Sequence, residues 1–192
     1  MILKDNSFTN LTHSAYYSLF KMKKIIVTGG SGFIGSNLVN YLIKKKFFVI
    51  NLDKLTYSSN KYQNNFKNKK NYKLIKIDIV NKKKLIEIIK KNKPSAIFNL
   101  AAETHVDRSI DSPKDFINTN IVGTFNLLES LRFLQKKKIN PKLIHISTDE
   151  VYGDIRNNLR SNENHKYEPS SPYSASKASA DHLVKSYIRT YN

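Results

Sequence analysis

Short apolar segments alternate with amphipathic stretches from about residue 24 onward. Brief apolar runs bounded by Gly, Pro, Asn or Lys predict buried strands, and apolar positions every three to four residues predict helices. The predicted strands are residues 25–28, 47–52, 72–77, 96–100 and 143–147. The predicted helices are residues 33–43, 82–91, 113–137 and 172–191. Strands that alternate with helices form right-handed βαβ units, so the pattern predicts an α/β fold with a doubly wound parallel sheet.

Residues 1–21 differ in composition from the rest of the chain. They are rich in Thr, Ser, Tyr and Asn, carry no Arg, and lack the continuous apolar region of a secretory signal. We interpret them as a disordered extension or a mis-assigned start before Met22, in preference to an organelle-targeting peptide. Residues 22–192 are expected to form one domain. Because the chain ends directly after a helix, we expect a sheet truncated before its substrate-binding lobe.

The composition narrows the class of protein. A chain of 192 residues with 40% hydrophobic residues suits one core-bearing domain. The absence of Cys excludes disulfides, thiolate metal sites and cysteine nucleophiles. The spacing of His105, His145 and His182 is not that of a metal site, so we expect no metal. No apolar run reaches the roughly 20 residues of a membrane-spanning helix, and we expect a cytoplasmic protein with no membrane contact.

The chain is strongly basic, with 33 Lys and Arg against 15 Asp and Glu and a formal net charge of +18. Only five of the cations are Arg, the residue that sequence-specific nucleic-acid proteins favour. The Lys residues lie in short runs, as in 44–46, 82–84 and 136–138, within or at the end of amphipathic stretches. We interpret them as a solvated surface with weak, salt-dependent attraction to polyanions, and expect no specific nucleic-acid partner.

A glycine-rich turn links the first predicted strand to the first helix. Gly29, Gly32 and Gly35 have the spacing G-x-x-G-x-x-G, which permits a tight turn, close approach of a pyrophosphate and close helix packing. Free N–H groups at the helix start favour phosphate. Asp53 follows 18 residues after Gly35, at the end of the second strand, where a carboxylate accepts ribose hydroxyls and repels a 2′-phosphate. This predicts a Rossmann-type domain that prefers NAD to NADP, against the alternative of a solvated loop aspartate.

Tyr173 and Lys177 are four residues apart and share one face of the last predicted helix. An ammonium group near a phenol favours the phenolate, so we expect Lys177 to lower the pKa of Tyr173. Such a tyrosine can take a proton from a sugar or alcohol hydroxyl. Ser147, at the end of the fifth strand, is a candidate partner. The alternative is an ordinary amphipathic helix.

Asp149 and Glu150 follow the fifth strand, at the edge where ligands of open α/β sheets bind. Neighbouring carboxylates repel, which favours one protonated and one ionised group and hence an acid and a base on adjacent atoms. The alternative is a solvated turn.

Six ordered segments carry a resemblance to a known family. They are VTGGSGFIGSNLV (27–39), LDKLTYSSN (52–60), LAAETHVDRSI (100–110), NTNIVGT (118–124), STDEVYG (147–153) and YSASK (173–177). Over about residues 23–192 the chain resembles the amino-terminal half of the dTDP-glucose 4,6-dehydratases, extended short-chain dehydrogenases/reductases. The Asp-Glu pair separates it from epimerases and simple reductases of that superfamily.

The resemblance implies that NAD is the cofactor and dTDP-glucose the nucleotide-sugar substrate. The implied cofactor contacts are Gly29, Gly32, Phe33, Ile34, Gly35, Asp53, Lys54, Leu55, Thr56, Asp78, Ile79, Leu100, Ala101, Ala102, Thr119, Ser147, Tyr173 and Lys177. The implied substrate contacts are Thr104, Thr148, Asp149 and Glu150. Thr104 stands where the family commonly has Ser, and the hydroxyl is retained.

The resemblance also implies a reaction in deoxysugar biosynthesis, with Tyr173, Asp149, Glu150, Lys177 and Thr148 as the catalytic residues. Tyr173 takes the proton of the glucose 4-hydroxyl, Glu150 removes the proton on carbon 5, and Asp149 protonates the departing 6-hydroxyl. Lys177 orients Tyr173 and the ribose, and Thr148 holds the sugar.

Several alternatives stay open. They are a UDP-glucose 4,6-dehydratase, a nucleotide-sugar epimerase or decarboxylase, and an inactive NAD-binding fragment. The long helix from Pro113 is interpreted either as part of a homodimer face of the full-length form or as packing on the chain's own sheet.

Overall fold

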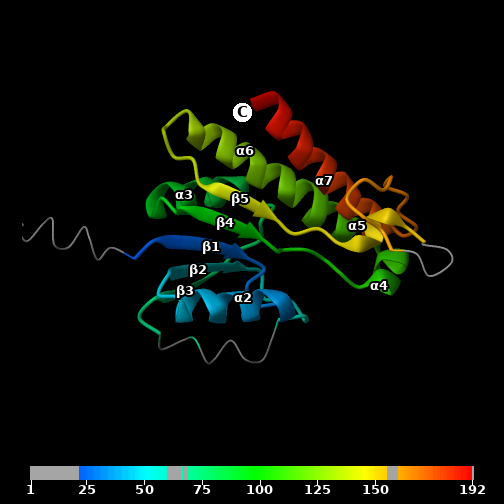
Figure 1. The fold of residues 1–192 in the computed structure, drawn as a ribbon. Helices are drawn as coiled ribbons and strands as arrows, with labels where there is room; N and C mark the ends of the chain where they lie inside the picture. Colours follow the sequence, from blue (N-terminus) through cyan, green and yellow to red (C-terminus); the bar gives the residue numbers. More distant parts are fainter. Residues whose placement is uncertain (1–21, 60–65, 67–68, 155–159, 192) are drawn as a thin grey trace, which may run out of the picture.

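The computed structural model describes residues 22–59, 66, 69–154 and 160–191. The interpretation of residues 1–21 lies outside the described residues. Within the described ranges five parallel strands form one sheet in the order β3-β2-β1-β4-β5 (Figure 1). The strands are β1 (Lys24–Thr28), β2 (Phe48–Asp53), β3 (Tyr72–Lys76), β4 (Ala96–Asn99) and β5 (Lys142–His145). The predicted parallel sheet is confirmed.

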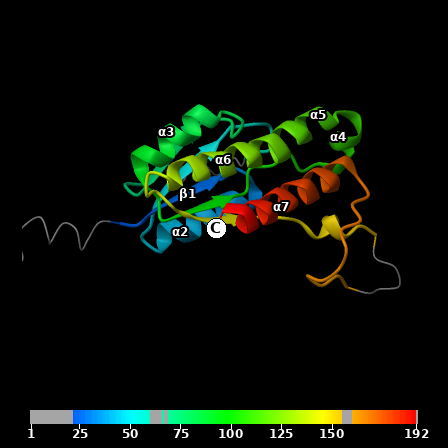
Figure 2. The same cartoon turned by 90° about the horizontal axis from the view of Figure 1, so that it is seen from above.

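Helices cover both faces of the sheet. They are α2 (Phe33–Lys44), α3 (Lys82–Asn92), α4 (Val106–Asp111), α5 (Pro113–Phe116), the π-helix η2 (Ile117–Gly123), α6 (Thr124–Gln135), the 3₁₀ helix η3 (Asp149–Tyr152) and α7 (Pro172–Tyr191). On one face, Val39 and Leu42 of α2 pack into a core with Val27 and Val49 of the sheet. Helices α3 and α6 bury their apolar sides on the other face, and α7 packs against α6 (Figure 2). This is the doubly wound arrangement.

Local sequence explains where α3 begins and ends. The Asn81 side chain accepts a hydrogen bond from the Lys84 N–H at 3.1 Å and so satisfies one of the free donors of the first turn. Leu85 and Ile89, one turn apart, are fully buried against the sheet. Lys93 takes a left-handed conformation with φ of 46° and ends the helix.

The predicted helix 113–137 is helical but not uniform. Residues Ile117–Gly123 form a π-helix, and the short helix α4 before it was not predicted. Phe116 and Leu134 are buried in the chain's own core, whereas Phe125 is 40% exposed, so only one side of the helix packs on its own sheet.

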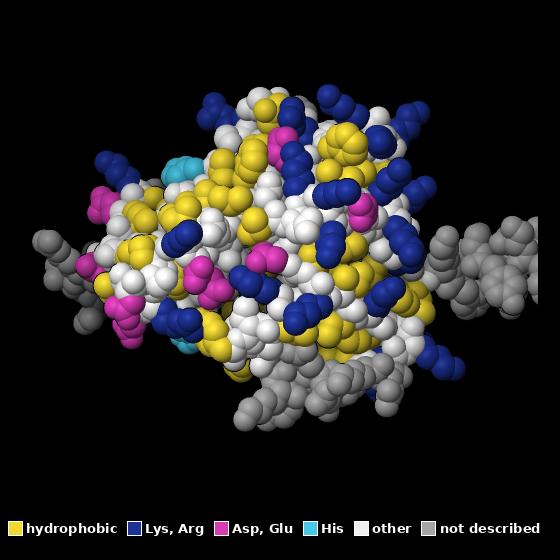
Figure 3. Space-filling model, turned by 180° about the vertical axis from the view of Figure 1, so that it is seen from behind, with side chains coloured by type: hydrophobic (Ala, Val, Ile, Leu, Met, Phe, Trp, Pro, Cys, Tyr) yellow, Lys and Arg dark blue, Asp and Glu magenta, His cyan; other side chains and the backbone are white. Residues whose placement is uncertain are grey.

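Charged side chains are unevenly placed on the face seen from behind. Figure 3 shows most of its Lys and Arg side chains gathered on one half and most of its Asp and Glu side chains toward the other. In the described part of the chain, no helix has both the length and the apolar character to cross a bilayer.

Candidate active site

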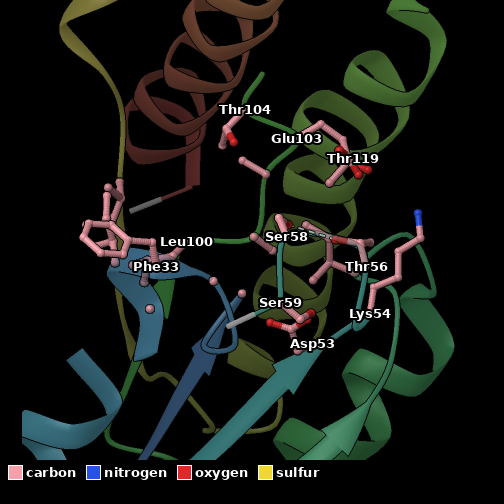
Figure 4. Close-up of a pocket in the computed structure, with 18 of the residues that line it drawn as sticks. Phe33, Asp53, Lys54, Thr56, Ser58, Ser59, Leu100, Glu103, Thr104 and Thr119 are labelled. Atoms are coloured by element: carbon pink, nitrogen blue, oxygen red, sulfur yellow. Dashed lines mark hydrogen bonds between the residues drawn. The ribbon is translucent and has the colours of Figure 1, made fainter. Parts of the chain in front are cut away.

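A cavity of about 540 Å³ lies at the carboxyl ends of the strands (Figure 4). Its walls come from the glycine-rich turn after β1, the ends of β2 and β3, the segment after β4, the π-helix and α7. Strand β1 pairs with β2 on one side and with β4 on the other, so the chain changes direction across the sheet here. Such a switch point is where open α/β sheets bind ligands.

The glycine-rich turn is shaped for a ligand's approach. Gly29 has φ of 67°, and a Cβ there would lie 2.7 Å from the Ala101 nitrogen. A Cβ on Gly35 would lie 2.1 Å from the Gly29 carbonyl oxygen, which prevents any larger residue from starting α2 so close to the turn. At Gly32 a Cβ would meet only that carbonyl, at 3.5 Å, so this position opens on the cavity. No side chain caps α2, whose first N–H groups suit an anion.

Asp53, the last residue of β2, lines the cavity beside the glycine-rich turn and is 9% exposed. One carboxylate oxygen accepts from the Ser31 N–H and the other from the Leu55 N–H, each at 2.8 Å. A carboxylate accepts about four hydrogen bonds, so acceptor capacity remains for a ligand's hydroxyls. Lys54 pairs with Asp78 at 3.1 Å beside it. Asp53 is therefore oriented by the backbone and is not a freely solvated loop residue.

The cavity gathers residues from distant parts of the sequence. Every residue assigned to cofactor contact lines it except Leu55, whose N–H instead supports Asp53. Thr104, assigned to substrate, lines it too. The lining residues that sequence reasoning missed are Leu52, Ser58, Ser59, Ile77 and Ile146. Leu52, Ile77 and Ile146 lie at or just past the carboxyl ends of strands, where parallel sheets bind ligands. The predicted strand ends could therefore have indicated these three residues as part of the site.

The π-helix presents two neighbouring residues to different partners. Thr119 lines the cavity, while the side-chain amide of Asn120 bonds both the N–H of Glu103 at 2.9 Å and its carbonyl at 3.0 Å. The Asn120 amide also donates to the Ser176 hydroxyl of α7 at 2.8 Å. The extra residue of a π turn commonly marks a functional site. Here Asn120, which sequence reasoning missed inside the NTNIVGT segment, ties the cavity wall to α7.

Tyr173 and Lys177 both line the cavity and are 7% and 5% exposed. The prediction that Lys177 lowers the pKa of Tyr173 is wrong for this structure. Burial raises the Tyr173 pKa, the hydrogen bond with Thr148 lowers it, and the charges of Glu150 and Asp149 raise it. The Lys177 ammonium instead donates to the Ile146 carbonyl at 2.6 Å.

The Asp149-Glu150 pair lies in η3, just outside the cavity. Both side chains are exposed, and the buried Val151 holds the short helix against the protein. The Thr148 hydroxyl accepts from the Glu150 N–H at 3.3 Å. The structure thus brings Thr148, Asp149 and Glu150 within electrostatic reach of the Tyr173 hydroxyl.

Ser147 has a different partner from the one expected. The Ser147 hydroxyl donates to Asp181, so in this structure Ser147 is not a partner of the Tyr-Lys pair, although it lines the cavity. Nowhere in the described ranges do three or more His, Asp or Glu side chains form a group that could hold a metal. His105 directly precedes α4 and stacks on the Tyr57 ring, with the ring centres 5.7 Å apart.

The strand order and the position of the cavity beside β1 define an α/β protein of the Rossmann type. The model of the GDP-mannose 4,6 dehydratase family matches residues 26–192, and the chain belongs to this family.

Individual proteins and solved structures are also similar to this chain. A dTDP-glucose 4,6-dehydratase from Haemophilus influenzae is 48% identical over 178 residues, which cover 88% of this chain and 53% of that protein. The crystal structure of a Bacillus anthracis dTDP-glucose 4,6-dehydratase in complex with NAD is 41% identical, with a TM-score of 0.76, over 88% of this chain and 51% of that one. A Thermus thermophilus UDP-glucose 4-epimerase in complex with NAD has a TM-score of 0.77 at 30% identity, over the same shares. The chain spans about half the length of the curated relatives it matches.

Proposed function

We propose that this chain binds NAD in the cavity beside β1 and belongs to a protein that converts dTDP-glucose to dTDP-4-keto-6-deoxyglucose. The observation that carries the proposal is the meeting of Tyr173 and Lys177 of α7 with the Thr148–Glu150 segment at the cavity's edge. A UDP-glucose 4-epimerase shares the fold at a TM-score of 0.77, against 0.76 for the dehydratase, so the fold does not distinguish the two reactions. The higher identity to dehydratases and the Asp-Glu pair favour water elimination.

The residues present fit NAD. The open Gly32 position and uncapped start of α2 suit a pyrophosphate, and Asp53, with its remaining acceptor capacity, suits two ribose hydroxyls. An ionised Asp53 also repels a 2′-phosphate, which favours NAD over NADP. Thr119 and Lys177 would hold the nicotinamide end.

The chain's own side chains would supply the proton transfers. The chemistry that bound NAD provides is hydride acceptance from carbon 4 of the sugar and hydride return to carbon 6. Tyr173, deprotonated for this step, takes the proton of the 4-hydroxyl, and the hydrogen bond with Thr148 favours its phenolate. Glu150 then removes the carbon-5 proton made acidic by the 4-ketone. Asp149 gives a proton to the 6-hydroxyl, which leaves as water.

The test is conversion of dTDP-glucose by the protein expressed from the complete reading frame. The product's ketone enolises in alkali and absorbs light, which provides the assay. Tyr173→Phe should lower kcat by about 10³-fold or more, because it removes the only base for the first proton transfer in this scheme. The exposed Asp115→Asn serves as a control for loss of a surface carboxylate.

Other outcomes distinguish the alternatives. Asp149→Asn with Glu150→Gln should abolish water elimination, and a protein that keeps 4-epimerase activity without both acids would be an epimerase. Conversion of UDP-glucose in preference to dTDP-glucose would show that the substrate carries uracil instead of thymine. NAD binding by calorimetry with turnover of neither sugar would contradict the enzymatic proposal and support a binding protein.

A homodimer and a cytoplasmic location stay predictions. The side chains of Phe125 and Phe133 on α6, and of Ile188 and Tyr191 on α7, are each at least 40% exposed. These neighbouring helices would supply the dimer face, which light scattering would test.

A further inference from the structure

A buried polar network lies behind the proposed active site. The Thr28 hydroxyl donates to the Asn99 side-chain oxygen at 2.6 Å, and the Asn99 amide lies 3.0 Å from Nδ1 of His145. An amide nitrogen only donates, so Nδ1 accepts and Nε2 carries the proton. That Nε2 faces Asp181 Oδ1 at 3.4 Å, with both side chains 8% exposed. The network joins the ends of β1, β4 and β5 to α7.

Asp181 also connects to two segments around the Asp149-Glu150 pair. Its Oδ2 accepts from the Ser147 hydroxyl, directly before Thr148. The same oxygen accepts from the Tyr167 hydroxyl at 3.0 Å, and the Tyr167 ring packs edge-on against Tyr152, the last residue of η3, at 5.4 Å. One carboxylate therefore contacts both the start and, through two rings, the end of the 147–152 segment.

On its own helix Asp181 lies four residues after Lys177 and eight after Tyr173, so all three share a face of α7. Burial of Lys177 lowers its pKa, and the Asp181 charge opposes that shift. The Asp181 pKa is itself held below its ordinary value by His145, Ser147 and Tyr167 against the opposing effect of burial. The carboxylate is therefore kept ionised close to a buried ammonium group.

We propose that Asp181 is a positioning residue that fixes the 147–152 segment against α7, on the helix face that also carries Tyr173 and Lys177. This inference rests on the proposed function. Asp181 does not line the cavity, so it acts through Ser147, Tyr167 and Lys177 and touches neither cofactor nor sugar.

The experiment compares Asp181→Asn with the wild type in the protein from the complete reading frame. Asn keeps the size of the side chain but removes the charge. We expect kcat to fall about tenfold while the KM for dTDP-glucose and the affinity for NAD stay within about twofold, because positioning affects the reacting state more than binding. Glu87→Gln, an exposed acid of α3, is the matched control and should behave as the wild type.

The pH profile separates positioning from a structural role. Without the Asp181 charge, Lys177 loses its proton at lower pH, so the alkaline limb of kcat should move to lower pH. The acid limb does not depend on the charge of Lys177 and should stay. The other titratable groups facing Asp181 or its partners are His145 of β5, Tyr152 of η3, Tyr167 of the loop before α7, and Lys185 and His182 of α7. His145→Gln combined with Asp181→Asn tests whether titration of the His145 imidazole contributes to the change in the pH profile.

Each outcome decides the inference. Wild-type kcat in Asp181→Asn overturns it, as does a lowered kcat with a lower melting temperature and an unmoved alkaline limb. If Asp181→Asn does not fold, Tyr167→Phe carries the test, with an expected loss of about threefold in kcat; a wild-type value overturns the inference. An inactive wild type contradicts the proposed function and the inference together, whereas an active wild type with an unaffected Asp181→Asn contradicts the inference alone.

Discussion

At the scale of single residues, Asp53 gives the sharpest test of cofactor choice. Asp53→Asn removes the charge and replaces one acceptor with a donor, next to backbone N–H groups that need acceptors. We expect NAD affinity to fall about tenfold or more, as for loss of a hydrogen bond to a charged group, and discrimination against NADP to shrink. Calorimetry with both nucleotides on this chain measures both effects. Unchanged NAD affinity beside an unchanged Asp115→Asn control would remove Asp53 from the site.

Individual residues were predictable where backbone geometry or a strand end dictates their place. Gly29 and Gly35 stand where a Cβ would collide with backbone, and Asp53 ends a buried strand, so sequence alone located them. The pKa of Tyr173 was not predictable, because it depends on burial and on carboxylates from another part of the chain. Ser147 was misjudged for the same reason, since its partner Asp181 is 34 residues away.

At the scale of elements, Glu129 of α6 joins three helices. Its carboxylate accepts from Arg132 at 2.8 and 3.0 Å and from the Tyr187 hydroxyl of α7 at 2.8 Å, and lies 3.4 Å from the Lys82 ammonium of α3. Hydrogen bonds from Arg132 above all, and then from Tyr187 and Lys82, lower the Glu129 pKa to about 2, although burial opposes them. Because the Glu129 pKa is lower in the folded protein than its ordinary value of 4.5, the ionised carboxylate stabilises the fold at pH values above 4.5. That stabilisation is lost as the pH falls toward 2.

Glu129→Gln should therefore lower the melting temperature at pH 7 by about 2–8 °C, the effect of losing roughly 1–2 kcal/mol in a domain of this size. The difference from wild type should shrink between pH 4.5 and pH 2, which thermal melts at several pH values would measure. Glu87→Gln, without the three partners, should melt as the wild type. A difference that persists unchanged at pH 2 would show that the charge of Glu129 is not the cause.

Sequence reasoning located the elements in which the apolar pattern repeats over many residues. Helix α7 was predicted from Pro172 to about Tyr191, as it is observed. The six residues of α4 are too few to show a period, and the π turn adds one residue to a helix without any local composition change. Both depend on contacts to other segments, such as the Asn120 bonds to Glu103 and Ser176.

At the scale of the whole molecule, the cavity connects both halves of the sheet, since its lining runs from Gly29 to Lys177. A ligand bound there contacts segments that separate on unfolding, so NAD should stabilise the entire domain. At a concentration 100 times its Kd, mass action supplies about 2.7 kcal/mol, or a rise in melting temperature of roughly 5–11 °C for a chain of this length.

The net charge of +18 makes an anion control necessary for that measurement, because any polyphosphate is attracted to so basic a surface. Inorganic pyrophosphate at matched ionic strength should raise the melting temperature by much less than NAD, and the small rise should vanish as salt is added. The NAD effect should persist at about 0.5 M salt, because Asp53 and the buried wall of the cavity contribute contacts that salt does not screen. Equal shifts with pyrophosphate and NAD would mean that surface charge, not the cavity, binds the nucleotide.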